Sequence, residues 1–157
     1  HYKSGEIIPD SLLSKMTKAN KFNQGFSTTE YLAASYLDLF WHLQGDESES
    51  VNDFEAKVIK RIGLIPEIGF RYRSTYFSHI FAGGYSASYY CYIWAAILET
   101  DAFALFEEKG LYDQESAQKL YRHVYSMGNT KDPMEEYILF RGSEPSVEAL
   151  ISKRGLQ

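Results

Sequence analysis

Helix-length segments separated by short polar, Gly or Pro breaks run along the whole chain, and this pattern constrains the fold most strongly. The expected helices cover residues 9–20, about 27–43, 51–61, about 86–106, 113 or 116 to 128, 133–140 and 145–153. No Asn-Gly hairpin signal and no sustained alternation of apolar and polar residues lies between them, and these are the patterns typical of strands. The sequence therefore predicts an all-α fold of roughly seven helices.

Turn-forming and capping residues set the expected boundaries. Gly25 tolerates a left-handed backbone, so residues 22–26 are expected to turn. Ser27 or Thr28 is then expected to cap the next helix. That helix is apolar on most sides, which predicts that it is largely buried. The amphipathic helix after it is expected to end at Gly63.

Composition excludes several classes of protein. Hydrophobic residues make up 45% of the chain and charged residues 24%, which is typical of a globular protein. Sixteen basic and twenty-one acidic residues give a net charge of -5, which argues against a nucleic-acid partner. A single cysteine excludes an intrachain disulfide and a multi-thiolate zinc site. The acidic stretch Gly45 to Ser50 lacks the alternating spacing of an oxygen-ligand loop, so it is expected to be a solvated loop.

The length of 157 residues suits one ordinary domain, residues 1–157. The chain opens at His1 without Met, and residues 2–8 resemble the middle of a longer sequence. We therefore expect a cut piece of a larger protein. No apolar run approaches the ~20 residues of a membrane helix, and no signal-peptide pattern is present. These features predict no membrane partner and a cytoplasmic location.

The motifs of self-contained catalytic sites are absent from the sequence. The four histidines are His1, His42, His79 and His123, and none belongs to a His-Glu-x-x-His motif. No phosphate-binding Gly-rich loop and no Gly-x-Ser-x-Gly elbow is present. Cys91 lies in an apolar segment, where a small buried hydrophobe is expected in preference to a nucleophile.

The chemically informative segment covers residues 79–92. Gly83 and Gly84 allow the backbone to approach a ligand closely or to take a positive φ. On a helix with about 100° per residue, Tyr85, Tyr89 and Tyr92 fall on one face, within about 60° of one another. The opposite side, expected to face the core, carries Tyr90, Trp94, Ile97 and Leu98.

Two interpretations of these tyrosines are open from the residues alone. The phenols pack against neighbours with their hydroxyls in solvent, or they line a cleft as hydrogen-bond donors. A phenol with a pKa near ~10 stays protonated at neutral pH and can donate to a developing oxyanion. His79 is either a second donor or a structural residue.

The segment Phe77 to Trp94 resembles the tyrosine-rich segment of the thimet oligopeptidase family of zinc metallopeptidases, and in particular its peptidyl-dipeptidase (dipeptidyl carboxypeptidase) branch. The resemblance extends to residues 21–26, 28–34, 101–103, 127–129, 140–142 and 144–145, in the right order. It covers essentially the whole chain. It implies an almost wholly helical fold with a deep channel between two halves.

The resemblance also implies where the zinc site lies. The family binds one zinc through a His-Glu-x-x-His helix and a further Glu, all upstream of such a segment. The chain is then the C-terminal portion of a larger zinc peptidase, and the N-terminal zinc-bearing part of the same polypeptide is its partner. Zinc is expected in the full-length enzyme, and no metal is expected on this portion, which alone should be inactive.

The resemblance assigns roles by motif position. Tyr85 and Tyr92 would stabilise the oxyanion, and His79 would bind the substrate backbone or the tetrahedral intermediate. Substrate-binding roles fall to Tyr89 and to a loop formed by Gly83 and Gly84. The substrates implied are short peptides, from which C-terminal dipeptides are released.

Two positions depart from the family pattern, Ser88 in place of a common glycine and Ser143 in place of a common arginine. Neither belongs to the tyrosine face. Arg71 and Arg73 suit a substrate's C-terminal carboxylate, or pair with acidic neighbours. Two other functions stay open: an oligoendopeptidase of the same family, and a non-catalytic helical module that binds peptides.

Overall fold

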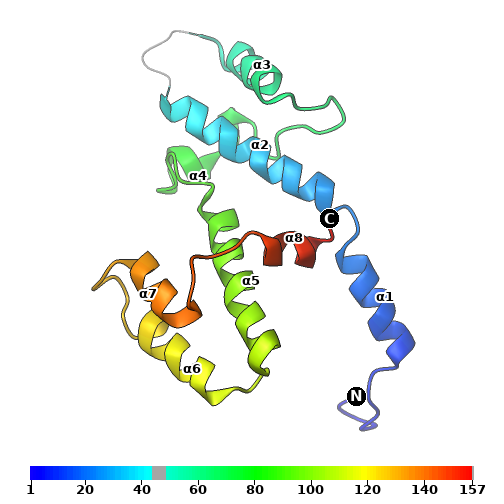
Figure 1. Cartoon of the computed structure of the whole chain (residues 1–157). Coiled ribbons are helices and arrows are strands. Elements are labelled where there is room, and N and C mark those ends of the chain that lie inside the picture. The colour runs from blue at the N-terminus through cyan, green and yellow to red at the C-terminus, as the bar shows by residue number, and fades with distance from the viewer. Residues whose placement is uncertain (44–48, 157) are drawn as a thin grey trace. The chain divides into compact units, whose positions relative to one another are not determined.

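The computed structural model describes residues 1–43 and 49–156, and these residues form helices joined by turns, with no strand among them. The all-α prediction is confirmed. The helices are α1 (Asp10–Asn20), α2 (Gln24–Leu43), α3 (Val51–Ile62), α4 (Ser78–Phe81), α5 (Cys91–Lys109), α6 (Gln114–Leu120), α7 (Pro133–Arg141) and α8 (Glu148–Arg154) (Figure 1). Seven of these described helices have at least seven residues, and α4 is a single turn.

The contacts within the chain group into two compact units, residues 1–92 and 93–157. The boundary falls in the first turn of α5. Each unit has its own core. We expected residues 1–157 to form one helical domain, and this stays a prediction.

Helix α3 forms as the sequence predicts. The Ser50 hydroxyl accepts the backbone N–H of Asp53 at 3.2 Å and caps the first turn. Phe54 and Val58, four residues apart, are both buried on one face. Gly63 ends the helix with a left-handed φ of 66°.

The core of the first unit lies between α2, α3 and the segment that leads to α5 (Figure 1). Its buried members are Ala34, Leu37, Phe54, Val58, Phe77, Ile80 and Tyr89. The Trp41 ring lies 3.8 Å from that of Phe54, centroid to centroid, so aromatic packing joins α2 to α3. Only residues 33–35, 37 and 38 of α2 are buried, so the expectation of a largely buried helix holds for its middle part alone.

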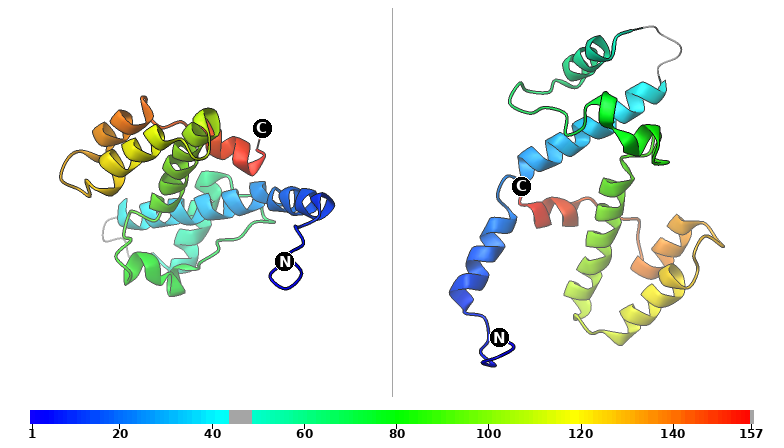
Figure 2. Two further views of the ribbon diagram at one scale, coloured as in Figure 1. Left: turned by 90° about the horizontal axis from the view of Figure 1, so that it is seen from below. Right: turned by 180° about the vertical axis from the view of Figure 1, so that it is seen from behind.

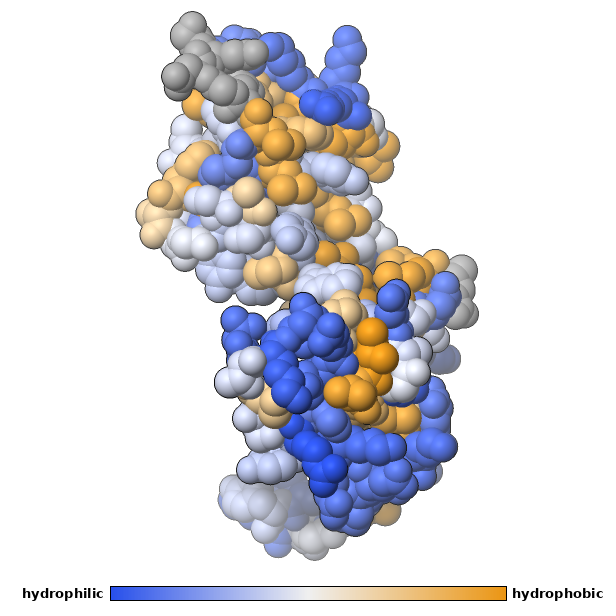
Figure 3. Space-filling view, turned by 60° about the vertical axis from the view of Figure 1, so that its left-hand side comes forward, coloured by the Kyte–Doolittle hydropathy of each residue, from blue (hydrophilic) through white to orange (hydrophobic). Residues whose placement is uncertain are grey.

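Helix α1 is the blue helix next to the N-terminus in Figure 2. None of its residues is buried. Leu12, Leu13 and Met16 form a short apolar stripe on this helix, and each is about half exposed. Other large apolar side chains also reach the surface, as the face in Figure 3 shows. Apolar helix faces of this kind usually mark contact surfaces.

The second unit packs α5 against α6 and α7 around Leu105, Tyr137 and Phe140. Asp113 caps α6 by accepting the N–H of Ser116 at 2.8 Å. The helix continues as a π-helical turn, η2 (Tyr121–Tyr125), which ends the expected helix earlier than residue 128. Asp132 caps α7, which begins with Pro133 as expected.

Two expected helix starts are wrong for identifiable reasons. Asn23, with φ of 56°, makes the turn before α2, and Gly25 lies inside the helix, so neither Ser27 nor Thr28 is its cap. Helix α5 begins at Cys91 and not near residue 86, because residues 86–90 form a turn. The acidic stretch Gly45 to Ser50 lies mostly outside the described residues.

Candidate functional site

The predicted site residues lie on α4, on the turn that follows it, and on the first turn of α5. His79 belongs to α4, while Tyr85 and Tyr89 belong to the turn. Only Tyr92 is in α5. The helical wheel that placed the three tyrosines on one face is therefore the wrong local geometry.

The turn nevertheless brings the same rings together. The Tyr85 and Tyr92 rings stack with centroids 5.3 Å apart and planes 23° from parallel. Tyr89 meets Tyr92 edge-on at 5.5 Å. The His79 ring lies 5.6 Å from Tyr89 and 6.1 Å from Tyr85. One imidazole and three phenols thus form a continuous aromatic cluster, which we call the His–Tyr cluster.

The members of the cluster differ in exposure. Tyr92 is 44% exposed, whereas Tyr89 is 3% exposed and belongs to the core of the first unit. The expected core-facing side is wrong for Tyr90 and Trp94, which are 48% and 43% exposed. For Tyr90 the reason is that the turn, and not a helix, sets the direction of each side chain before Cys91. Trp94 lies within α5, and nothing in the turn explains its exposure.

The two glycines have distinct conformational roles. A Cβ on Gly83 would lie 3.0 Å from the backbone Cα and O of His79, so a side chain there would crowd the backbone of α4. Gly84 takes φ of 80°, which side chains disfavour. Directly after them, the N–H of Tyr85 donates to the His79 carbonyl at 3.0 Å. The pair therefore lets the chain fold back over α4.

A buried carboxylate on α2 holds the far side of the turn. Asp38 is fully buried and accepts the N–H of Ala87 and the N–H of Tyr89, both at 2.9 Å. Nδ1 of His42 lies 2.9 Å from the same carboxylate and 2.8 Å from the Asp38 carbonyl. Since a carbonyl only accepts, Nδ1 carries the proton. Three donors thus satisfy the buried charge.

Ala87 shows why such a hold is needed. Its φ of 54° is left-handed, which costs a residue with a side chain roughly 1–2 kcal/mol. The Tyr31 hydroxyl donates to the Tyr89 carbonyl, and the two rings stack at 5.3 Å. Helix α2 therefore contacts the turn through both Asp38 and Tyr31. The sequence analysis missed Asp38, although an acidic residue inside an apolar helix is the signal that could have found it.

Hydrogen bonding keeps the exposed phenol protonated. The hydrogen bond between the Tyr92 and Tyr85 hydroxyls raises the pKa of Tyr92 from 10.0 to about 12, with a smaller contribution from desolvation. Burial raises the pKa of Tyr89, and the positive charge of Arg71 opposes that rise. The phenols of Tyr92 and Tyr89 therefore stay protonated at neutral pH and can donate a hydrogen bond.

His79 has a polar atom without a partner. Its Nδ1 is buried and makes no hydrogen bond within the described residues. The ring also lies 5.2 Å from Tyr72, an aromatic neighbour that the sequence analysis did not select. Because an unsatisfied buried nitrogen is costly, this atom suits a ligand group that donates to it or accepts from it.

The two arginines before the cluster differ in their partners. Arg73 donates through Nε to the buried Glu55, which also accepts the N–H of Ser74 at 2.7 Å. Of the two roles left open for Arg73, binding a substrate carboxylate or pairing with an acidic neighbour, the structure shows the pairing. The Arg71 guanidinium lies 5.4 Å from the centre of the Tyr72 ring.

The site holds no metal-binding set of its own. Among residues 1–43 and 49–156, no three His, Cys, Asp or Glu side chains are grouped so as to hold a metal ion. Cys91 is neither fully buried, as the sequence analysis expected, nor fully exposed.

In the same described ranges, no helix has the length and apolar character of a membrane span.

Comparison with known proteins places the chain in a family. The profile described as "Peptidase family M3" matches residues 1–156. The chain belongs to peptidase family M3. Within this family it is 38% identical to the dipeptidyl carboxypeptidase of Escherichia coli, over 99% of the chain and 23% of that protein. It is 33% identical to oligopeptidase A of the same organism, over 100% of the chain and 23% of that protein.

A plant relative is also similar to nearly the whole of this chain. The organellar oligopeptidase A of Arabidopsis thaliana is 36% identical, over 99% of the chain and 20% of that protein. The chain thus spans less than a quarter of the length of these relatives. The family resemblance read from the tyrosine-rich segment is confirmed.

A separate pocket of ≈ 660 Å³ lies in the second unit, between α5, η2 and α7. Its lining is mostly apolar, and His123 and Glu136 are among its polar residues. Nδ1 of His123 lies 2.8 Å from Oε2 of Glu136, so these groups already satisfy each other. No residue of the His–Tyr cluster lines this pocket, so we assign the site to the cluster and not to the pocket.

Proposed function

We propose that this chain is the C-terminal portion of a zinc-dependent peptidase that hydrolyses short peptides and releases C-terminal dipeptides. The observation that carries the proposal is the His–Tyr cluster, gathered by the turn after α4 within a family M3 chain. Relatives named dipeptidyl carboxypeptidase and oligopeptidase A support a peptidase.

In this proposal the cluster binds the carbonyl that is attacked. Attack of water on a peptide carbonyl places negative charge on its oxygen, which needs donors already in position. Tyr92 and Tyr85 supply adjacent hydroxyl groups, and the raised pKa of Tyr92 keeps that phenol protonated well above neutral pH. His79, with its unpaired Nδ1, would bind the substrate backbone or the tetrahedral intermediate.

The other predicted residues surround these donors. Gly83 and Gly84 would form the loop beside the bound peptide. The substrate-binding role of Tyr89 stays a prediction, and its burial also suits a role in holding the turn. Arg71 is the better candidate for the substrate's terminal carboxylate, because Glu55 already occupies Arg73.

The zinc is assigned to an upstream His-Glu-x-x-His helix and a further Glu, as the family resemblance implies. Zinc there would act as a Lewis acid on the scissile carbonyl. The described residues offer no such set, so the zinc-bearing part is the partner in this proposal. The exposed apolar face of α1 suits contact with that part. A cytoplasmic location stays a prediction.

The test uses two peptides that differ only at the C-terminus, one with a free carboxylate and one with an amide. A longer polypeptide that includes the zinc-bearing part is expected to release a dipeptide from the first and to leave the second intact. Internal cleavage of the amide would favour the oligoendopeptidase. If both peptides stay intact in the presence of zinc, the peptidase proposal is wrong.

A second measurement addresses the binding module. The 157-residue chain alone is expected to cleave neither peptide and to retain no zinc after dialysis. A longer polypeptide that binds the peptides without cleaving them would favour the module.

A further inference from the structure

The most constrained polar group in the first unit is the carboxylate of Asp38, in the middle of α2. Its exposure is 0%, although its neighbours on the helix are apolar. A charge is buried at this depth only where several donors satisfy it. The identity of those donors indicates what Asp38 does.

Two of the three donors are backbone groups of the turn that carries the tyrosines. Oδ1 accepts from Ala87 and Oδ2 accepts from Tyr89, each at 2.9 Å. One side chain therefore fixes two amides two residues apart. Tyr85 precedes these two amides in the chain, and Tyr92 follows them in the first turn of α5. The relative position of the two phenols depends on the path between them.

That path is not one the backbone adopts unaided. Ala87 has a left-handed φ of 54°. Without an acceptor, residues 86–90 would be free to extend α5 backwards, as the sequence pattern favours. A helical path would turn Tyr89 and Tyr90 to other directions and separate Tyr89 from the core.

We propose that Asp38 is a positioning residue that sets the geometry of the Tyr85–Tyr92 donor pair through the Ala87–Tyr89 turn. Its catalytic consequence rests on the proposed peptidase function. The positioning itself is a property of this chain. Asp38 touches no reacting atom in this assignment and acts only through the turn.

The test is Asp38→Asn, which keeps the shape of the side chain. The amide has one oxygen and one NH₂ group, so it can accept only one of the two N–H groups well and opposes the other with a donor. In the 157-residue chain, hydrogen exchange at Ala87 and Tyr89 is expected to rise at least ~10-fold. NMR of ring-labelled tyrosine is expected to show the pKa of Tyr92 falling from about 12 toward 10.0 as its bond with Tyr85 loosens.

Glu55→Gln provides the matched control. Glu55 is also buried, at 3% exposure, and also accepts a backbone N–H, that of Ser74. It is expected to lower the thermal stability of the chain while exchange at Ala87 and Tyr89 and the titration of Tyr92 stay as in the wild type. If Glu55→Gln moves these two readouts as far as Asp38→Asn does, Asp38 is merely one structural carboxylate among others and the proposal is overturned.

Tyr31→Phe keeps the proposal testable where Asp38→Asn does not fold. It removes the hydroxyl that donates to the Tyr89 carbonyl without altering a buried charge. The same two readouts are expected to move in the same direction, but less. Wild-type exchange and titration in a folded Asp38→Asn, or in Tyr31→Phe where Asp38→Asn does not fold, would overturn the positioning role.

In the longer, zinc-containing polypeptide, Asp38→Asn is expected to lower kcat by about 10- to 100-fold, the scale of a small displacement of catalytic groups. The zinc content is expected to stay unchanged. A wild-type kcat together with altered exchange would overturn the catalytic consequence alone. If the wild-type polypeptide cleaves no peptide, the proposed function fails, while exchange and titration still decide whether Asp38 positions the tyrosines.

Discussion

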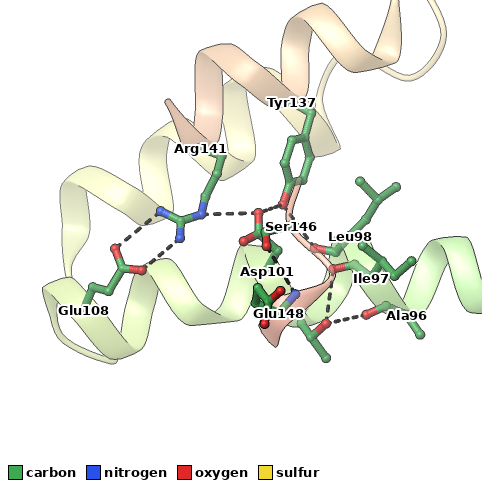
Figure 4. A network of polar contacts seen from close by, with 10 residues as sticks. Ala96, Ile97, Leu98, Asp101, Glu108, Tyr137, Arg141, Ser146 and Glu148 are labelled. Atoms are coloured by element: carbon green, nitrogen blue, oxygen red, sulfur yellow. Dashed lines mark hydrogen bonds and ion pairs between the residues drawn. The ribbon is translucent and has the colours of Figure 1, made fainter. Parts of the chain in front are cut away.

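Each of the two units contains a buried aspartate beside tyrosines, and the two use it differently. In the first unit, Asp38 accepts backbone N–H groups of the turn. In the second, Asp101 accepts the hydroxyl of Tyr137 at 2.7 Å, and the Arg141 guanidinium lies 3.4 Å from the same oxygen (Figure 4). Arg141 also bonds Glu108 at 2.8 Å.

The two units differ in which tyrosine hydroxyls remain available to a ligand. Burial and the bond to Asp101 raise the pKa of Tyr137 well above its usual value, and its phenol is committed to the fold. In the first unit the carboxylate accepts the backbone N–H groups of Ala87 and Tyr89, so it takes no tyrosine hydroxyl, and the Tyr92 side chain stays 44% exposed. The buried carboxylate of the first unit thus holds a turn between two phenols, whereas that of the second unit takes up the phenol itself.

The largest effect is expected from Tyr92→Phe in the longer, zinc-containing polypeptide. Loss of one oxyanion donor is expected to lower kcat by roughly 10²–10³-fold, with zinc content unchanged. Steady-state kinetics and metal analysis measure both. Tyr137→Phe in the same polypeptide is the control and is expected to keep kcat. An unchanged kcat in Tyr92→Phe would remove the oxyanion role.

Tyr137→Phe tests the other half of the comparison. It leaves the buried Asp101 without its hydroxyl donor, which is expected to lower the free energy of unfolding by about 1–3 kcal/mol. Thermal or urea unfolding measures the change. Tyr112→Phe in the same unit, where the side chain is 90% exposed, is expected to change nothing. Equal effects of the two would contradict a structural role for the Tyr137 hydroxyl.

Gly83→Ala tests the turn itself. The added Cβ meets the His79 backbone at 3.0 Å, and backbone atoms cannot move aside cheaply. We expect a loss of about 1–3 kcal/mol in the free energy of unfolding. Gly69→Ala is the matched control, because nothing lies within 4 Å of its new Cβ. The prediction fails if the two variants unfold at the same denaturant concentration.

The smallest effect is expected in alkaline solution. The pKa of Tyr92 is raised in the folded chain, so its hydrogen bond contributes stability below pH 10.0 and loses that contribution as the pH rises toward 12. Tyr85→Phe is expected to return the pKa of Tyr92 toward 10.0, measured by NMR of labelled tyrosine. A Tyr92 pKa that stays near 12 in this variant would show that another group raises it.

Most of the helices could be predicted from the sequence, because their signals are local. Gly63 ends α3 with the expected left-handed backbone, and Pro133 begins α7. The start of α5 could not be predicted in this way. Residues 86–90 carry a helical pattern, yet the turn there depends on bonds to Asp38, about fifty residues earlier in the chain.

The candidate site, too, could be predicted only in part from the sequence. The motif around His79, Tyr85 and Tyr92 was recognisable, and the structure brings these rings together. Their helical-face argument was wrong, and Tyr90 and Trp94 are exposed instead of core-facing. Asp38 went unnoticed, because one acidic residue in an apolar helix does not reveal which backbone amides it will meet.

By itself, the sequence determined the helical class, most helix ends and the family, since periodicity, capping residues and motif order are properties of neighbouring residues. The tertiary structure alone decided which tyrosines are buried and which are presented. That choice depends on a buried carboxylate on α2 meeting amides from a distant turn, where satisfying the charge outweighs the local preference for a helix.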